Sequence, residues 1–229
     1  MSSDRTSTTI RKKRTQNGIE RILEDTQLQR WNAAYASRRL QKPAWDDWPQ
    51  KHMPIIRNAR LPALDLGCGA GGNAFFLSTA GHFPICGDYS MEALRKIRSV
   101  TSFIPVVLFD MRQGLPFREN VLEIVVADLS LHYFDSKTTN RIIRSILNLL
   151  VDNGTLLSRV NSINDKNYGA GAGVEIERHF YLDRGNYKRF FDEADIRTFF
   201  GDWRIESCCE YGTLRYGVEK KVWEIVCRK

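Results

Sequence analysis

The stretch ALDLGCGAGGN, residues 63–73, runs from apolar residues into a turn that carries glycine at alternate positions. Its apolar part has the length of a short buried strand, and residues 73–80 have the composition of a helix. Glycine allows left-handed φ angles and lets backbone lie against a ligand, because it has no Cβ. A strand, a glycine-rich turn and a helix in this order are typical of a nucleotide-binding site.

The glycine turn fits two kinds of cofactor, or a turn that holds no ligand. Gly67, Gly69 and Gly72 satisfy the G-x-G-x-x-G pattern of dinucleotide-binding enzymes. Asp65, however, lies two residues before the first glycine. A dehydrogenase strand usually stays apolar there, because it approaches an anionic pyrophosphate. A carboxylate at this position favours a ligand with a positively charged end.

The segment from Leu64 to Gly71 resembles the first motif of class I S-adenosylmethionine (SAM) methyltransferases. The resemblance implies that SAM, which carries a sulfonium and an ammonium group, is the cofactor, and that S-adenosylhomocysteine is the product. It also implies that the acid and the turn bind the cofactor through Asp65, Gly67, Cys68, Gly69 and Gly71.

Acids at later strand ends follow the order that this resemblance implies. Asp88 closes a second strand, 21 residues after the first glycine, and is expected with Tyr89 to bind the cofactor ribose. Ser90 is expected to cap the next helix, which leaves Asp88 for the ribose hydroxyls. After a third apolar run, Asp110 and Met111 are expected to contact the adenine. Alternatively, Asp88 is only a helix cap, and Asp110 and Met111 are plain turn residues.

A fourth strand, residues 123–127, is followed by the sequence DLSLHYF. Ligands of open α/β sheets bind beyond the carboxyl ends of the strands, so Asp128 and Leu129 are expected to contact the cofactor. His132 is the candidate general base, because histidine titrates near neutral pH, and Tyr133 is expected to line the acceptor pocket. The alternative is that His132 only packs. The Asp/Asn-Pro-Pro-Tyr/Phe pattern is absent, which counts against methylation of adenine N6 in nucleic acids.

The N-terminal part divides into a polar arm and a helical segment. Residues 1–16 are interpreted as a disordered arm, whose basic cluster Arg11–Arg14 is alternatively a nuclear address or a nucleic-acid contact. Residues 17–50 are expected to form a helix and a loop over the cofactor. Within them, Trp31 and Tyr35 lie in a pattern similar to the helix that precedes the first motif in small-molecule methyltransferases, and they are expected to bind SAM.

The second half predicts the remaining part of the fold. Arg159 lies inside a fifth strand, where it either holds an acidic substrate group or pairs with an internal acid, and Asn161 is expected to line the acceptor pocket. Residues 161–191 are interpreted as a mobile insertion that acts as a lid. Two closing strands, within residues 203–227, are expected to pair antiparallel.

Composition is typical of one α/β domain over residues 17–229. The five cysteines lack C-x-x-C spacing, which favours free thiols in a reducing cytosol over disulfides or a metal site. No apolar run is long enough for a membrane span, and a cytoplasmic location is expected, or a nuclear one if the basic cluster is an address. The formal net charge is +7, and the arm supplies a good part of it, so a broad nucleic-acid surface is not indicated.

The sequence therefore predicts a doubly wound, Rossmann-like α/β fold. Its sheet is expected to have seven strands, mostly parallel with an antiparallel C-terminal strand, and helices on both faces. The resemblance is greatest to compact bacterial small-molecule methyltransferases of the tellurite and thiopurine type. It implies methyl transfer to oxygen, nitrogen or sulfur of a small molecule by a monomer or homodimer. The alternatives are an RNA or protein methyltransferase, a nicotinamide dehydrogenase, and a non-catalytic SAM-binding protein.

Overall fold

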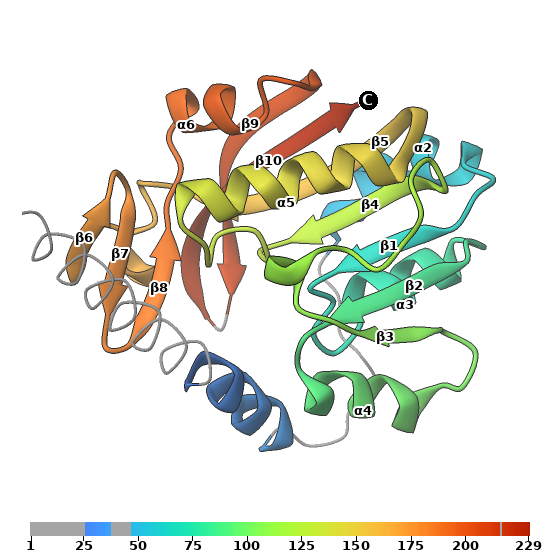
Figure 1. Cartoon of the computed structure of the whole chain (residues 1–229), viewed down its shortest axis with the longest axis horizontal. Coiled ribbons are helices and arrows are strands. Elements are labelled where there is room, and N and C mark those ends of the chain that lie inside the picture. Colours follow the sequence, from blue (N-terminus) through green and yellow to red (C-terminus); the bar gives the residue numbers. More distant parts are fainter. Residues whose placement is uncertain (1–25, 38–46, 216) are drawn as a thin grey trace, which may run out of the picture.

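The computed structural model describes residues 26–37, 47–215 and 217–229, and the arm with its basic cluster lies outside these residues. A seven-stranded sheet forms the centre of the molecule (Figure 1). In sheet order its strands are β3 (Val106–Leu108), β2 (Pro84–Asp88), β1 (Ala63–Leu66), β4 (Leu122–Asp128), β5 (Leu150–Asn161), β10 (Val218–Arg228) and β9 (Arg204–Arg215). The first five are parallel, and β10 is antiparallel to both β5 and β9. The expected fold class is confirmed.

Helices connect the strands, and α4, α5 and α6 begin at side-chain caps. Those between and beside the strands are η1 (Trp48–His52), α2 (Met53–Asn58), α3 (Gly72–Thr79), α4 (Met91–Val100), η2 (Met111–Gln113), α5 (Ser136–Leu149), η3 (Lys166–Tyr168) and α6 (Glu193–Phe199). Ser90, Asp135 and Asp192 each accept a hydrogen bond from a backbone N–H in the first turn of α4, α5 and α6 respectively. A further helix spans residues 26–36. No helix of the described residues is long and apolar enough to span a membrane.

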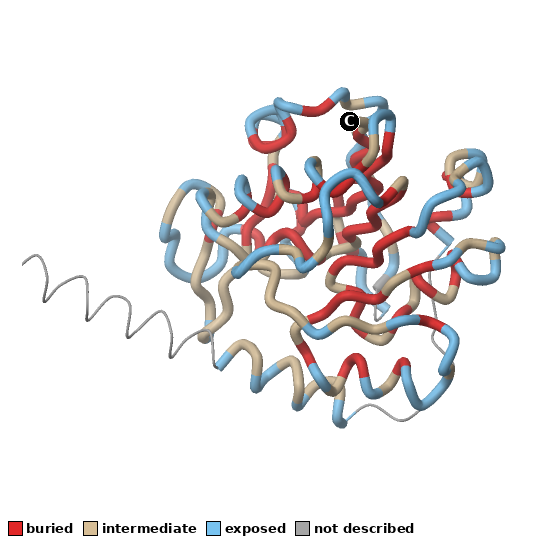
Figure 2. Tube along the Cα trace, turned by 45° about the vertical axis from the view of Figure 1, so that its right-hand side comes forward, coloured by how far each residue is buried: buried red, intermediate tan, exposed pale blue. Residues whose placement is uncertain are grey.

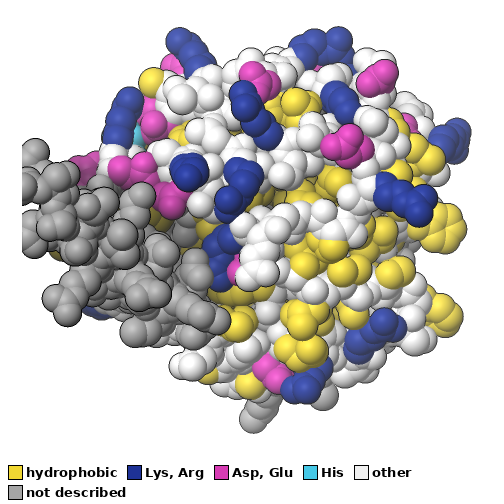
Figure 3. Space-filling model, viewed as in Figure 1, with side chains coloured by type: hydrophobic (Ala, Val, Ile, Leu, Met, Phe, Trp, Pro, Cys, Tyr) yellow, Lys and Arg dark blue, Asp and Glu magenta, His cyan; other side chains and the backbone are white. Residues whose placement is uncertain are grey.

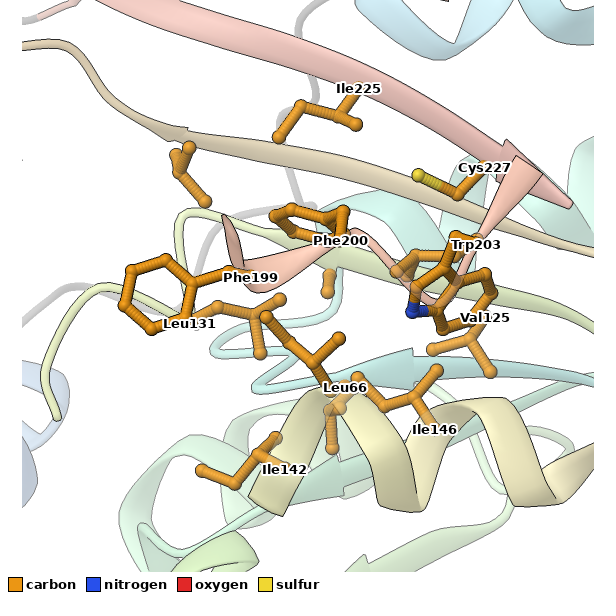
Figure 4. Close-up of a cluster of buried hydrophobic side chains, with 14 of the residues drawn as sticks. Leu66, Val125, Leu131, Ile142, Ile146, Phe199, Phe200, Trp203, Ile225 and Cys227 are labelled. Carbon is orange, nitrogen blue, oxygen red and sulfur yellow. The ribbon is translucent and has the colours of Figure 1, made fainter. Parts of the chain in front are cut away.

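Alternate side chains of the central strands enter two apolar cores. Val125 and Ala127 of β4 pack in the larger core, on the face that α5 and α6 cover. Ile124 and Val126 point to the other face, where they pack with α3. This alternation follows from the two-residue period of a strand, and it is why a strand buried on both faces is apolar throughout. Figure 4 shows the larger core, in which Leu66 and Val125 lie among side chains from α5, α6 and β10.

Residues 174–189 fold as a separate three-stranded antiparallel sheet. Its strands are β6 (Val174–Glu177), β7 (Phe180–Asp183) and β8 (Asn186–Arg189). Arg189 joins its strands to one another and to the rest of the chain, because its guanidinium donates to Glu177 and the carbonyl of Arg178 within residues 174–189 and to the carbonyl of Phe134 outside them. Most of its residues are exposed or half-buried, unlike the central strands (Figure 2). The interpretation of residues 161–191 as a lid remains a prediction.

Candidate functional site

The backbone conformation and close packing of the turn explain why it contains glycine at alternate positions. Gly67, Gly69 and Gly71 have φ angles of 70°, 54° and 84°, in the left-handed region that glycine adopts without strain. A Cβ on Gly67 would lie 2.4 Å from Cβ of Ser130, and one on Gly69 would lie 2.4 Å from the hydroxyl of Tyr35. The turn therefore packs against the carboxyl end of β4 on one side and against the N-terminal helix on the other. Cys68, between the glycines, is buried.

Asp88 holds the glycine turn to the end of β2. Its Oδ2 accepts from the backbone N–H of Gly69 at 2.9 Å, and its Oδ1 accepts from the N–H of Ser90 at 2.8 Å. Burial raises the pKa of Asp88, which opposes the effect of these hydrogen bonds. A carboxylate has about four acceptor sites, so capacity remains for ribose hydroxyls. Tyr89 follows, and burial raises the pKa of its phenol as well.

Asp65 lies beneath the same turn, and it is only 1% exposed. Its Oδ2 accepts from the N–H of Ala74 at 3.0 Å, at the start of α3. Its Oδ1 and the hydroxyl of Ser130 are buried and have no hydrogen-bond partner among the described residues. Burial raises the pKa of Asp65 to about 7, with a smaller contribution from Asp128. Buried, poorly solvated acceptors beside a glycine turn fit a ligand with cationic ends, such as SAM.

Asp110 and Met111 lie near the turn but have additional partners. The carboxylate of Asp110 caps η2 and forms a two-pronged ion pair with Arg112, with Nη2 to Oδ2 at 2.6 Å. The methyl of Met111 lies 3.6 Å from where a Cβ on Gly67 would stand. Met111 is thus placed against the turn, whereas Asp110 is placed by its pair with Arg112. Their contact with adenine remains a prediction.

The structure pairs Arg159 with an internal acid. Its guanidinium donates to Asp128 at 2.7 and 2.9 Å, so the ends of β4 and β5 are joined by a buried salt bridge. Arg159 is 1% exposed, and its guanidinium also lies over the ring of Trp48 at 4.7 Å. Of the two alternatives for Arg159, internal pairing is the one observed. Its contribution to substrate binding, and that of Asp128 to cofactor binding, remain predictions.

An aromatic cluster follows β4. Leu129 has a φ of 54°, which turns the chain sharply at the strand end. His132 is 3% exposed, and its ring centroid lies 4.3 Å from that of Tyr133. Trp31 of the N-terminal helix packs edge-on against Tyr133 at 5.8 Å and stacks on Tyr35 at 5.9 Å. Residues expected to bind cofactor and residues expected to act on the acceptor are thus in one cluster.

The N-terminal helix bridges the two sides of the site. The side-chain carbonyl of Asn32 accepts from the hydroxyl of Ser90 at 2.7 Å, at the start of α4. Arg30 donates to the side chain of Asn186, at the start of β8. Figure 1 shows this helix, in blue, between α4 and the lower end of β8. Sequence analysis did not identify Asn32 or Arg30, because helical spacing alone does not tell which polar residues meet a partner.

Asn161 lies at the end of β5 in a second polar cluster. Its side-chain carbonyl accepts from Nζ of Lys220 at 2.7 Å, and the same ammonium donates to Asp165 at 2.6 Å. All three side chains are buried. The sequence held no local signal for this cluster, since Lys220 comes from β10, 59 positions after Asn161.

Comparisons with known proteins agree with this geometry. Residues 63–154 match the family described as "Methyltransferase domain". Human mitochondrial arginine-hydroxylase NDUFAF5 is 42% identical over 81 residues, which are 34% of this chain and 23% of that protein. The chain spans less than half the length of the curated relatives that it matches, 23% and 45%.

Two solved structures illustrate the likeness in fold. A SAM-dependent methyltransferase from Methanosarcina mazei superimposes with a TM-score of 0.65 at 19% identity, over 77% of this chain and 97% of that one. The 1,6-didemethyltoxoflavin-N1-methyltransferase of Burkholderia thailandensis, solved with its substrate and S-adenosylhomocysteine, has a TM-score of 0.59 at 16% identity, over 80% and 81% of the two chains. Residues 63–154 thus match the methyltransferase-domain family, and the chain shares its fold with solved SAM-dependent methyltransferases.

Proposed function

We propose that this protein transfers the methyl group of SAM to an oxygen, nitrogen or sulfur nucleophile of a small molecule. The observation that carries the proposal is the glycine turn held by Asp88, with the buried Asp65 beneath it, at the carboxyl ends of β1 and β2. This arrangement occurs within the part of the chain that matches the methyltransferase family. The antiparallel β10 also supports a methyltransferase over a nicotinamide dehydrogenase.

Each group of residues has a distinct role in the proposed reaction. Bound SAM supplies an activated methyl group on a sulfonium, so the protein needs mainly to bind, orient and exclude water. The glycine turn and Asp88 would hold the ribose side, and Asp65 would compensate positive charge at the methionine end. Trp31 and Tyr35 would cover this part of the site from the N-terminal helix.

The cluster around His132 would receive the acceptor. An oxygen or nitrogen nucleophile loses a proton when it is methylated, and His132 would accept that proton at an imidazole nitrogen. Tyr133 and Asn161 would line the pocket. Support comes from burial. His132 is 3% exposed, its carbonyl accepts from Arg189 of β8, and its ring lies beside Tyr133, which packs on Trp31 of the N-terminal helix, so a polymer has little access.

An RNA or protein acceptor is the alternative, and it would use the basic arm. Figure 3 shows Lys and Arg side chains dispersed among Asp and Glu on one face, with no continuous basic stripe. A protein that tracks a phosphate backbone usually gathers its cations on one surface. Deletion of residues 1–16 would separate the two functions, since only a polymer acceptor requires the arm.

Two measurements test the proposed function. Calorimetric titration with S-adenosylhomocysteine should show binding, and titration with NAD should show none. Methyl-labelled SAM, incubated with a library of small acceptors, should then label at least one product, whose mass distinguishes a methyl from a hydroxyl group. Lack of binding of S-adenosylhomocysteine would refute the proposal, and binding without transfer to any acceptor would favour a non-catalytic SAM-binding protein.

A further inference from the structure

Lys188 differs from the fully buried cations of the described residues. Arg159, Arg189 and Lys220 are each at most 5% exposed, and each contacts a carboxylate, of Asp128, Glu177 and Asp165 respectively. This is the rule for buried charges, because an unpaired one is costly to desolvate. The ammonium of Lys188, which is half-buried, has a single hydrogen-bond partner among the described residues, the carbonyl oxygen of Tyr168 at 3.2 Å.

The acids nearest to Lys188 are already paired with other cations. Asp165 accepts from Lys220 at 2.6 Å, and Asp183 lies beside Arg184 at 4.0 Å. Burial lowers the pKa of Lys188, and the positive charge of Arg30 lowers it further, against the opposing effect of these two acids. Arg30 itself contacts the neutral side chain of Asn186. Two neighbouring cations therefore have only neutral hydrogen-bond partners in the described part of the chain.

The sequence neighbours of these two cations contact the candidate reaction centre. Lys188 precedes Arg189, whose backbone N–H donates to the carbonyl of His132 at 2.7 Å. Arg30 precedes Trp31, whose ring packs against Tyr133 at 5.8 Å. Each cation is thus one residue along the chain from a residue that contacts the His132–Tyr133 pair, and the two lie on different elements.

A cavity adjoins the cross-strand neighbour of Lys188. Its cross-strand neighbour on β7 is Tyr181, and paired residues of an antiparallel sheet share one face. Tyr181 lines a cavity of about 190 Å³ together with Asn164, Lys166 and His179. Lys188 therefore shares its face of the insertion sheet with Tyr181, beside this cavity, and with Glu175, which pairs with Tyr181 from β6.

We propose that Lys188 and Arg30 bind an anionic group of the methyl acceptor, a carboxylate or a phosphate, and so select acidic small molecules. The inference rests on the proposed function, since it assigns the acceptor class of that same site. An acidic group would supply the counter-charge that the described residues do not. A negative group held there would leave the rest of the acceptor directed to His132 and Tyr133.

The test uses the full chain saturated with S-adenosylhomocysteine and titrated separately with inorganic phosphate and with benzoate. At least one anion should bind the wild-type complex, and the one that binds identifies the chemistry as phosphate or carboxylate. Lys188→Gln should weaken that anion at least about tenfold, the lower end for a hydrogen bond to a charged group. Lys188→Arg keeps the charge and should retain most of the affinity. The exposed lysine in Lys137→Gln is the matched control and should change nothing.

Two outcomes would overturn the inference: neither anion binds the wild-type complex, or Lys188→Gln binds both as tightly as wild type. The exposed Arg30 provides a variant that does not depend on how Lys188→Gln folds. Arg30→Gln should weaken the same anion about twofold, the usual size for an exposed charge, and unchanged binding would contradict the assignment. Failure of wild type to bind S-adenosylhomocysteine would instead refute the proposed function, so the two failures are distinguishable.

Discussion

The central sheet and the insertion sheet support opposite sides of the site in different ways. β4 is buried at five of its seven positions, whereas β7 is buried at one of its four and β6 at none. The proposed cofactor side therefore rests on two apolar cores, which stabilise in proportion to buried area. The proposed acceptor side depends on a few polar contacts, and regions of that kind open locally at low cost. Damage to the first should affect folding and cofactor binding together, and damage to the second should affect the acceptor alone.

The largest effect is expected from Gly67→Ala, at the junction of the central sheet and the glycine turn. The new Cβ would stand 2.4 Å from Cβ of Ser130, at a φ of 70°. Left-handed strain alone costs on the order of 1–2 kcal/mol, and the overlap adds to it. We expect a lower melting temperature and loss of measurable S-adenosylhomocysteine binding, followed by thermal denaturation and calorimetry.

Gly81→Ala is the matched control for that variant. Gly81 also has a positive φ, of 86°, but no atom lies within 4 Å of a Cβ placed there. The variant should have the backbone strain of a positive φ but no steric overlap of its Cβ. Its affinity for S-adenosylhomocysteine should therefore stay near that of wild type. Equal effects of the two substitutions would mean that packing against Ser130 is unimportant.

Arg189→Met should loosen the insertion sheet and leave the cofactor side intact. The substitution removes a buried guanidinium that donates to Glu177 and to two carbonyls, and among the described residues Glu177 keeps only the two hydrogen bonds from Ser136. Loss of one partner of a buried pair is strongly destabilising, here about 2 kcal/mol because Glu177 is partly exposed. Hydrogen exchange should accelerate in residues 174–189, while the affinity for S-adenosylhomocysteine changes less than about threefold.

Arg178→Met is the comparison for the insertion sheet. Arg178 is 61% exposed and pairs with Asp192 at the surface. A surface pair contributes at most about 1 kcal/mol, so exchange in the same residues should change little. If Arg178→Met loosens the sheet as much as Arg189→Met does, the buried guanidinium is not its anchor.

A pH-dependent effect is expected from Asp65→Asn in the central sheet. Burial raises the pKa of Asp65 from its ordinary value of 3.8 to about 7, so the folded protein keeps a proton that the unfolded chain releases. The stability from this carboxyl is present below about pH 4 and is lost as the pH rises through about 7. Asparagine does not titrate. The free energy of unfolding of the variant, relative to that of wild type, should therefore rise by at least about 1 kcal/mol when the pH is raised from about 4 to about 8.

Denaturant unfolding of both proteins at the two pH values measures that difference. Asp152→Asn, at an exposed aspartate, provides the control for the loss of one carboxylate. A stability difference between Asp65→Asn and wild type that is the same at both pH values would show that Asp65 does not titrate in this range.

The smallest effect is expected from Asn32→Ala, in the helix that bridges the two sides. It removes the hydrogen bond to the hydroxyl of Ser90, which contributes about 1 kcal/mol or less. Faster exchange within residues 26–36 should be the main change, with the overall melting temperature close to wild type. Gln29→Ala, at an exposed position of the same helix, should leave the exchange unaltered.

The cofactor side was predictable from sequence because its signals are local. The glycine turn and Asp88 each come immediately after a strand whose successive residues are apolar. Such a run can be recognised in one sequence without any knowledge of distant contacts. The cap Ser90 was also predicted and is confirmed.

The acceptor side was less predictable because its contacts join distant segments. Arg159 meets Asp128 across 31 positions, and Lys220 meets Asn161 across 59. The insertion strands are half exposed and carry charges on both faces, so the alternation that identifies a strand is weak there. The glycines at 169, 171 and 173 made the sequence of this segment resemble a loop without regular structure.

The hydrogen bond from Gly69 to Asp88 should also affect the rate at which the cofactor binds and leaves. Since the carboxylate already holds the turn by a bond of 2.9 Å, the backbone entropy of ordering that loop is lost when the chain folds. A ligand that arrives does not have to meet this cost again, so a preorganised turn favours affinity. The rate of cofactor release should then be set by movement of the helix of residues 26–36 away from the site, and not by motion of the turn.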